Sequence, residues 1–376
     1  MGKMTAEENK DSSNGEDLLV LRGVFKNYGT VEALRGIDLA AKRGECLVIL
    51  GPSGAGKTTT LKVIAGLESV KQGEIYFNKR LLNNLEPKER NVAMVFETYA
   101  LYPHVTVYEN LASSLRALSM DEKEIEERVR NVATMLGIYP FLDRRPGFLS
   151  GGQRQRVALG RALVKPVDLY LMDEPIAHLD AKLRYQMIGE FKHLQETLKI
   201  SIIYVTHDWR EAMSLGNHIV VLNKGKVVQY GTKEEIFRRP SNTFVAQIIG
   251  DPPMNLLQGT VSSEKGLSVF QAGNITLHLG EQLQQGSAIL GIRSSKIHLA
   301  TTTGNNRISA EVYSSGRHGM NTVVSMKVVD EIFKTEFRGH QQYEIGQNIT
   351  VQLDLNGACI FNENRKLMRV LGEKDE

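Results

Sequence analysis

The fold is decided by a glycine-rich stretch of eight residues, Gly51, Pro52, Ser53, Gly54, Ala55, Gly56, Lys57 and Thr58. The apolar run CLVIL (Cys46 to Leu50) precedes it, and the helical pattern TTLKVIAGL follows it. Glycines let consecutive backbone N–H groups turn inward, and a helix N-terminus adds the positive end of its dipole. A strand, such a loop and a helix in this order predict a binding site for the phosphates of a nucleotide.

Two side chains at the end of this loop have defined roles in such a site. The Lys57 ammonium would reach the β and γ phosphates of ATP, and the Thr58 hydroxyl would ligate Mg²⁺. We count Thr59, in the first helical turn, among the nucleotide-binding residues.

An acidic pair follows another apolar run, LYLMD (Leu169 to Asp173). Standing alone, an apolar run that ends in Asp-Glu is usually structural. Beside a phosphate loop, the same pair suits catalysis, because a neighbouring strand would bring it next to the phosphates. We expect Asp173 to be an inner or outer ligand of Mg²⁺ and Glu174 to act as the general base that polarises the attacking water.

His207 and Tyr28 are further candidates. His207 follows the run SIIYV, and its strand end would point at the same crevice, so we expect it to contact the γ-phosphate. A histidine at a strand end is otherwise a turn residue. Tyr28 precedes the first phosphate strand and could stack its ring on adenine. Position alone does not distinguish this role from one in the core.

Composition excludes several classes of protein. Among 376 residues, 46 Lys and Arg balance 43 Asp and Glu, so we expect no nucleic-acid partner. No apolar run reaches the roughly 18 residues of a membrane helix, and the polar, acidic start does not resemble a secretory signal. Cys46 and Cys359 lie far apart, which excludes a disulfide framework or zinc site and suits a reducing cytoplasm.

The chain is expected to form two domains after a flexible tail, residues 1–17. In residues 18–250, apolar runs alternate with helical patterns, which predicts an α/β domain with a mostly parallel sheet and a helical insert at 105–163. Its expected strands are Cys46 to Leu50, Asn91 to Phe96, Leu169 to Asp173, Ser201 to Val205 and His218 to Asn223. After Asp251, short alternating runs predict a small β barrel or sandwich over residues 251–376.

One motif has no role in a single phosphate-loop site. Ser150, Gly151, Gly152 and Gln153 open a helical pattern, RQRVALGRALV, shortly before the acidic pair. This motif resembles the signature of ATP-binding cassette (ABC) ATPases, which have a P-loop NTPase fold. The resemblance implies a head-to-tail dimer in which each signature helix binds the γ-phosphate held by the other subunit, with Asp180 also in the nucleotide site.

Within that family the chain resembles the ATPases of maltose-type carbohydrate importers. The segments that carry this resemblance are VFETYALYPHVTVYENL, LSGGQRQRVALGRALV, LDAKLR and VTHDWREAM. The β-rich extension, with GIRSSKI, resembles their regulatory oligosaccharide-binding-fold (TOBE) domain. The resemblance implies ATP hydrolysis at the cytoplasmic face of the membrane, two membrane permease subunits and an extracytoplasmic solute-binding protein.

The chain departs from the family pattern in three segments. Glu97 replaces a Gln that contacts Mg²⁺ and the attacking water, Ala177 and His178 occupy a loop where a Ser usually reaches the opposite site, and Trp209 replaces a common Gln. We hypothesise that Glu97 still ligates Mg²⁺. Glu97 and Ala177 leave both a homodimer and a heterodimer of cassettes open. In the heterodimer alternative, this chain is a weakly active regulatory cassette. An importer for polyamine, iron or sulfate also remains an alternative.

Overall fold

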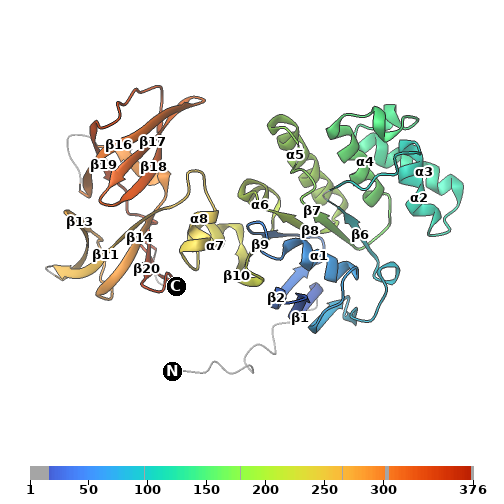
Figure 1. Ribbon diagram of the computed structural model, residues 1–376, viewed down its shortest axis with the longest axis horizontal. Helices are drawn as coiled ribbons and strands as arrows, with labels where there is room; N and C mark the ends of the chain where they lie inside the picture. Colours follow the sequence, from blue (N-terminus) through green and yellow to red (C-terminus); the bar gives the residue numbers. More distant parts are fainter. Residues whose placement is uncertain (1–16, 97, 178, 265, 301–304, 374–376) are drawn as a thin grey trace. The chain divides into compact units, whose positions relative to one another are not determined.

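The computed structural model describes residues 17–96, 98–177, 179–264, 266–300 and 305–373, and it divides into two compact units, Met1–Lys233 and Glu234–Glu376 (Figure 1). The division falls just after the first residue of α7 (Lys233–Arg238) and before α8 (Thr243–Ile248), whereas the composition shift lies at Asp251. The reason is a buried contact: Arg293 of the second unit donates to the backbone carbonyls of Phe237, Ala246 and Ile249. These two helices therefore belong to the second unit.

A six-stranded, mostly parallel sheet forms the centre of the first unit. Its order is β10 (Lys226–Thr232), β9 (His218–Asn223), β3 (Cys46–Leu50), β8 (Ser201–Thr206), β7 (Leu169–Asp173) and β6 (Val92–Val95). Every pair is parallel except β10 with β9. All five expected strands are present. Every residue of β3, β7 and β8 is buried, which explains why their sequences are apolar on both faces.

A second, antiparallel sheet in this unit was not expected from the sequence. Its order is β2 (Val31–Lys42), β1 (Asp17–Tyr28), β4 (Gln72–Phe77) and β5 (Arg80–Leu81). One hydrophobic core joins Leu21 of this sheet, Leu171 of the parallel sheet and Ile64 of α1 (Lys57–Ala65). Asp17, which the sequence analysis placed in the tail, is the first residue of β1.

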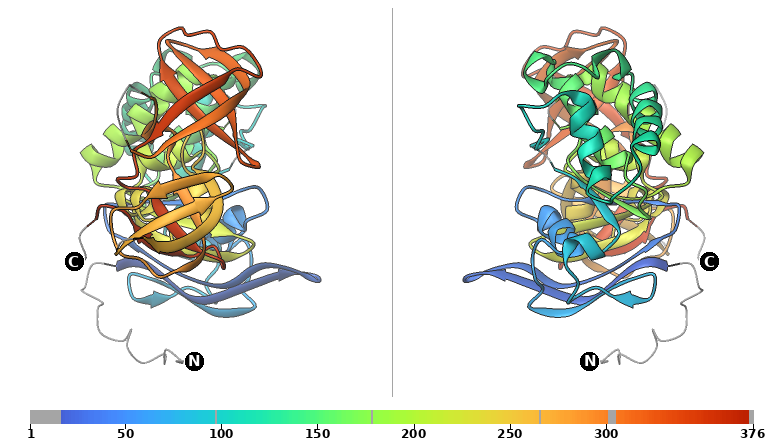
Figure 2. Two further views of the ribbon diagram at one scale, coloured as in Figure 1. Left: turned by 90° about the vertical axis from the view of Figure 1, so that its left-hand side faces the viewer. Right: turned by 90° about the vertical axis from the view of Figure 1, so that its right-hand side faces the viewer.

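Helices α2 (Val107–Arg116), α3 (Glu122–Met135) and α4 (Gly151–Leu163) form the expected helical insert (Figures 1 and 2). The amphipathic segment 120–135 forms α3, which buries Ile125 and Val129 on one face. The other helices of the unit are α5 (Ala181–Leu198) and α6 (Trp209–Leu215).

The second unit is built on two antiparallel sheets, which confirms the β-rich domain. The first has the order β13 (Ile275–His278), β12 (Leu267–Ala272), β11 (Asn255–Glu264), β14 (Gly286–Ile292), β20 (Cys359–Asn362) and β21 (Leu367–Val370). The second has the order β15 (Ile297–Leu299), β19 (Asn348–Leu353), β16 (Arg307–His318), β17 (Asn321–Val328) and β18 (Glu331–Arg338). Residues of both sheets, among them Phe270 and Phe333, share one core.

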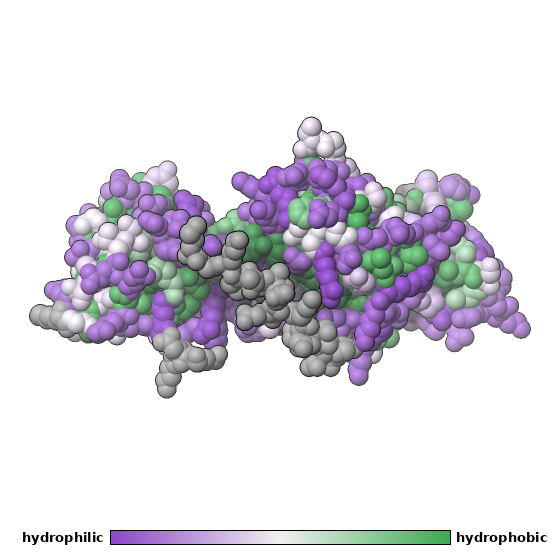
Figure 3. All heavy atoms as spheres, turned by 90° about the horizontal axis from the view of Figure 1, so that it is seen from below, coloured by the Kyte–Doolittle hydropathy of each residue, from purple (hydrophilic) through white to green (hydrophobic). Residues whose placement is uncertain are grey.

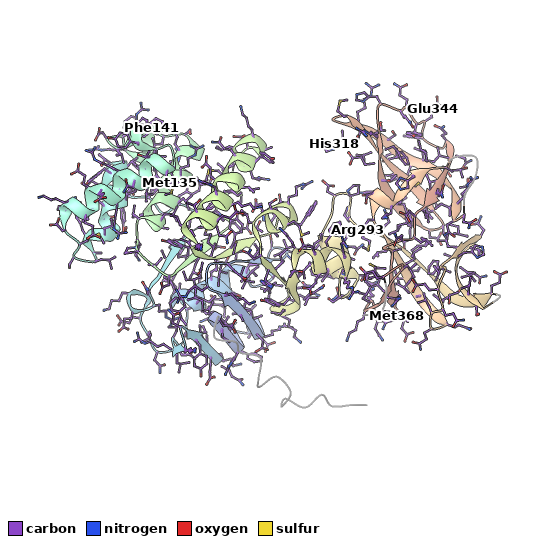
Figure 4. The ribbon with its side chains drawn as sticks, turned by 180° about the vertical axis from the view of Figure 1, so that it is seen from behind. Met135, Phe141, Arg293, His318, Glu344 and Met368 are labelled. Carbon is purple, nitrogen blue, oxygen red and sulfur yellow. The ribbon has the colours of Figure 1, made fainter. Side chains whose placement is uncertain are left out.

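Arg293 follows β14 and is 9% exposed (Figure 4). Its guanidinium also lies over the Phe237 ring, 4.4 Å from the centroid. No helix of the described residues is both long and apolar enough to cross a membrane. On the face drawn in Figure 3, polar residues cover most of each unit.

Candidate functional site

Three adjacent strands bring the candidate residues to one edge of the parallel sheet. β8 lies between β3 and β7, and the three run parallel. Their carboxyl ends therefore lie side by side, and each leads directly into a candidate segment: the glycine-rich loop 51–56 after β3, Glu174 after β7 and His207 after β8. Ligand sites of open α/β sheets lie at this edge.

The glycine-rich loop has the conformation that exposes backbone N–H groups. Gly54 and Gly56 take positive φ angles, 75° and 104°. Gly56 is the N-cap of α1 and no side chain caps that helix. The first N–H groups of α1 are thus available to a ligand, as a phosphate site requires. Lys57 Nζ donates to the Pro52 carbonyl at 3.1 Å, which turns its ammonium back over the loop.

Thr58 and Asp173 meet directly. The Thr58 hydroxyl donates to Asp173 Oδ1 at 2.9 Å, and Asp173 is 3% exposed. A hydroxyl and a carboxylate side by side at the end of a phosphate loop form an oxygen donor set of the kind that Mg²⁺ prefers. The residues present therefore fit this cation.

Glu174 links the loop to His207. Its Oε1 lies 3.4 Å from Lys57 Nζ, and its Oε2 lies 2.6 Å from His207 Nδ1. The Glu174 backbone takes a positive φ of 45°, and its N–H donates to the Val205 carbonyl at 3.0 Å. The strained backbone and this hydrogen bond hold the Glu174 carboxylate at the carboxyl end of β7. The His207 side chain is 57% exposed, whereas the Lys57 side chain is 6% exposed.

Tyr28 lies beside the first turn of α1. Its phenol lies close enough to Thr59 and Glu68 for both to influence its pKa, and Lys26 Nζ lies 5.1 Å from its ring centroid. Partial burial and the nearby Glu68 charge raise the pKa of Tyr28. The residue is still 42% exposed, so part of the side chain is accessible to a ligand. Stacking on a base requires such access.

The signature residues lie at the start of α4, where Ser150 and Gly151 are exposed. Ser150 Oγ accepts from the Gln153 N–H at 3.3 Å, and Gln153 Oε1 accepts from the Ser150 N–H at 2.9 Å. Ser150 and Gln153 thus form a capping box. Gly152 packs against Leu183, so closely that a Cβ would lie 2.2 Å from that side chain. Asp180 is likewise exposed and caps α5 by accepting from the Leu183 N–H at 3.0 Å.

Two expected positions, Glu97 and His178, lie outside the described residues. A polar cluster beside His207 was not expected from the sequence. In this cluster Glu211, 2% exposed, accepts from the Tyr204 hydroxyl at 3.0 Å and from Thr206 Oγ1 at 2.7 Å. Burial is the main cause that raises the pKa of Glu211. The motif VTHDWREAM contains Thr206 and Glu211, but only the fold shows that both side chains point inward.

Comparison with known proteins gives consistent matches. A family model described as ABC transporter matches residues 34–177. The trehalose/maltose import ATP-binding protein MalK of Thermococcus litoralis is 43% identical over 358 residues, 90% of this chain and 96% of that protein. The sn-glycerol-3-phosphate import ATP-binding protein UgpC of Rhizobium meliloti is 47% identical over 298 residues, 78% of this chain and 82% of that protein.

A solved dimeric ATP-binding cassette in a post-hydrolysis state, bound to ADP and phosphate, is 32% identical with a TM-score of 0.53. The match covers 57% of this chain and 98% of that one. The relatives above match 90% and 78% of the chain, and the phosphate loop, acidic pair and histidine meet at one sheet edge. The chain therefore belongs to the ATP-binding subunits of ABC transporters, a family of ATPases.

Proposed function

We propose that this chain is the ATP-hydrolysing subunit of an importer for a carbohydrate or a related polyol. In this role it couples ATP binding and hydrolysis to uptake through separate membrane subunits. The relatives named for trehalose/maltose and for sn-glycerol-3-phosphate import support this class of cargo. The 2.6 Å contact between Glu174 and His207 is the observation that carries the hydrolytic part of the proposal.

Glu174 acts as the general base. An ionised carboxylate only accepts hydrogen bonds, so Nδ1–H of His207 donates to Oε2 and leaves Nε2 to face the γ-phosphate. Glu174 Oε1 takes up the proton of the attacking water. Lys57 neutralises this carboxylate at 3.4 Å and moves to the β and γ phosphates when ATP binds, which frees Glu174 to work as a base.

The remaining candidates hold the nucleotide and the metal. The N–H groups of residues 51–59 cradle the phosphates, and the Tyr28 ring stacks on adenine. Thr58, Asp173 and Glu97 would hold Mg²⁺, which would supply positive charge to neutralise the phosphate oxygens.

Two cassettes complete each site, because Ser150 to Gln153 and Asp180 open two helices whose exposed starts are available to the opposite subunit. We propose that the dimer works at the cytoplasmic face of the membrane. Its partners are two permease subunits and an extracytoplasmic solute-binding protein. The structure of a dimeric cassette supports the pairing, and the departures at Glu97 and Ala177 keep both a homodimer and a heterodimer open.

Glu174→Gln tests the proposal. The variant should bind ATP like the wild type, lose at least about a hundredfold in turnover and accumulate as a closed dimer with ATP. Glu45→Gln is a matched control, because Glu45 also pairs with a histidine, His218 at 3.0 Å, but precedes β3 at the opposite end of the sheet. Undiminished hydrolysis by Glu174→Gln would reject the assignment of the base.

The cargo is tested on the assembled transporter. Membrane subunits that co-purify with the chain are reconstituted with their binding protein, and ATP hydrolysis is measured with maltose, trehalose, glycerol 3-phosphate and spermidine. We expect stimulation by a sugar or polyol ligand. Stimulation by spermidine alone would replace the carbohydrate class with polyamines.

A further inference from the structure

Arg184, in the first turn of α5, bridges two segments of the ATPase unit. On one side its Nη2 donates to the backbone carbonyls of Ala177 and Leu179, at 3.1 and 3.2 Å. On the other side Nη1 lies 3.6 Å from Asp208 Oδ2, and Nε lies 3.9 Å from Glu211 Oε1. One guanidinium thus contacts the loop before α5 and the first turn of α6.

The carboxylate side of this bridge is firmly held. The buried Glu211 accepts hydrogen bonds from two hydroxyls, one of them Thr206 Oγ1 at 2.7 Å. Thr206 Oγ1 in turn accepts from the Asp208 backbone N–H at 3.0 Å. Because Thr206 and Asp208 flank His207, the groups that face Arg184 belong to the same turn that presents His207 to Glu174. These hydrogen bonds hold Glu211 and the turn around His207 in place, whereas Arg184 Nε is buried without a hydrogen-bond partner among the described residues.

The two carbonyls that Arg184 contacts belong to a different loop, the one before α5. Ala177 and Leu179 precede Asp180, and in the proposed function this loop of one cassette faces the nucleotide site of the other. We infer that Arg184 is a positioning residue, which couples the placement of this loop to the placement of His207 in its own site. The inference rests on the proposed function, since only a dimer gives the loop an opposite site.

The side-chain chemistry suits arginine. A guanidinium carries five N–H donors in a fixed planar fork, so Nη2 can donate to two carbonyls while the charge of the same group lies within 4 Å of two carboxylates. A lysine ammonium in the same place keeps the charge near Asp208 and Glu211 but carries its three donors on one atom. The Arg184 side chain is 33% exposed, so water screens its charge and the hydrogen bonds to the two carbonyls carry much of the coupling.

Arg184→Gln and Arg184→Lys test the inference in the assembled transporter. For Arg184→Gln we expect kcat to fall at least about tenfold with the KM for ATP within twofold, because a misplaced catalytic group slows the reaction more than it weakens binding. The dependence on ATP concentration should also lose cooperativity. Arg184→Lys should fall between this variant and the wild type.

Hydrogen exchange supplies a readout that does not depend on turnover. In Arg184→Gln the Asp208 N–H should exchange about tenfold faster than in the wild type, together with the amides of 177–180. Arg130→Gln is the control: Arg130 also contacts a carboxylate and a neutral oxygen, Glu126 at 2.8 Å and Tyr139 at 3.2 Å, but on α3. It should match the wild type in both measurements.

Two failures are distinguishable. If wild type and Glu174→Gln hydrolyse ATP equally, the proposed function fails before Arg184 is tested. If Glu174→Gln is inactive but Arg184→Gln equals Arg130→Gln in kcat and cooperativity, the inference is overturned. Faster exchange confined to 177–180, with Asp208 unchanged, would also overturn it, because Arg184 would then stabilise the loop without coupling it to His207. If Arg184→Gln does not fold, the same measurements are made on Arg184→Lys and compared with Arg130→Gln.

Discussion

The Thr58 hydroxyl donates to Asp173 Oδ1 across 2.9 Å and so joins the first turn of α1 to the end of β7. The bond holds two oxygens side by side at the expected Mg²⁺ position. A hydrogen bond to a charged group contributes about 1.5–3 kcal/mol. Removal of the Thr58 hydroxyl should therefore delete one expected Mg²⁺ ligand and also leave Asp173, the other, without the bond that positions it.

Thr58→Val should therefore raise the Mg²⁺ concentration for half-maximal ATP hydrolysis about tenfold or more. Thr58→Ser keeps the hydroxyl and should stay close to the wild type. Titration of ATPase activity with MgCl₂ at saturating ATP measures both. Equal midpoints for Thr58→Val and Thr58→Ser would show that the hydroxyl does not support the cation.

Gly51 and Gly54 should respond differently to alanine. A Cβ on Gly51 would lie 2.3 Å from the Leu222 carbonyl oxygen, which belongs to the backbone of β9 and cannot move aside. A Cβ on Gly54 meets nothing within 4 Å, but its φ of 75° strains any L-residue. We expect Gly51→Ala to lower the free energy of unfolding of the ATPase unit by at least about 2 kcal/mol, and Gly54→Ala by about 1 kcal/mol.

Urea unfolding of both variants, followed by far-UV circular dichroism, measures this difference. The order of the two midpoints is the test. A lower midpoint for Gly54→Ala would mean that backbone strain outweighs the close contact at Gly51.

The parallel sheet was predictable because burial on both faces leaves a strong local signal: every residue of LYLMD lies buried in β7. The antiparallel sheet lacked such a signal. The register of β1 against β2 shifts between Leu21 and Val24, among other places, and each bulge breaks the alternation of apolar and polar residues. A pattern with a period of two is then no longer visible in the sequence.

The site divides in the same way. The sequence could place Lys57, Thr58, Glu174 and His207 at one edge of the sheet, because each comes after a buried strand and the carboxyl ends of parallel strands share an edge. Arg184 could not. Its partners Asp208 and Glu211 lie beyond the next strand, β8, at the start of α6. An arginine on an amphipathic helix is usually solvated. Only the packing of α5 and α6 reveals the contact.

Glu97→Gln tests the charge at a position outside the described residues. A carboxylate about 4 Å from a phosphate oxygen repels it by roughly 4 kcal/mol at an effective dielectric near 20, unless it binds Mg²⁺ or takes up a proton. If Glu97 ligates Mg²⁺, the variant should show a changed Mg²⁺ requirement and a shifted pH profile of steady-state turnover. Identical profiles for the two proteins would show that the charge does not matter.

Arg293 should hold α7 and α8 to the β sheets. Its hydrogen bonds to Phe237 and Ala246 measure 2.9 and 3.1 Å, and burial lowers its pKa to about 10, which still leaves it charged at neutral pH. Arg293→Met would leave buried carbonyls without a donor, at a cost of about 3 kcal/mol or more. We expect a lower melting temperature for the isolated fragment 234–376 with this change.

The contacts of Arg293 with α7 and α8 also predict at which residue a folded fragment of the second unit can begin. Fragment 234–376 should melt cooperatively, and fragment 251–376, which lacks both helices, should melt lower or not fold. Arg365→Met is a control for the loss of an arginine elsewhere in the unit. Equal melting of the two fragments would place the boundary at Asp251 instead.

The raised pKa of the buried Glu211 predicts that the free energy of unfolding depends on pH. Burial raises the pKa of Glu211 in the folded protein above its value in the unfolded chain, with Asp208 adding to the shift while Thr206, Tyr204 and Arg184 oppose it. The folded state therefore holds this proton more tightly. The stability that this provides is fully present below the unfolded pKa and is lost as pH rises through the folded pKa.

Glutamine has no such titration and can still accept hydrogen bonds from Tyr204 and Thr206. The free energy of unfolding of Glu211→Gln, relative to wild type, should therefore increase from pH 4 to pH 7. Urea unfolding of the ATPase unit at intervals of one pH unit measures it. Glu124→Gln, which removes an exposed carboxylate from α3, controls for net charge. A constant difference between Glu211→Gln and wild type across this range would mean that burial does not shift the Glu211 pKa.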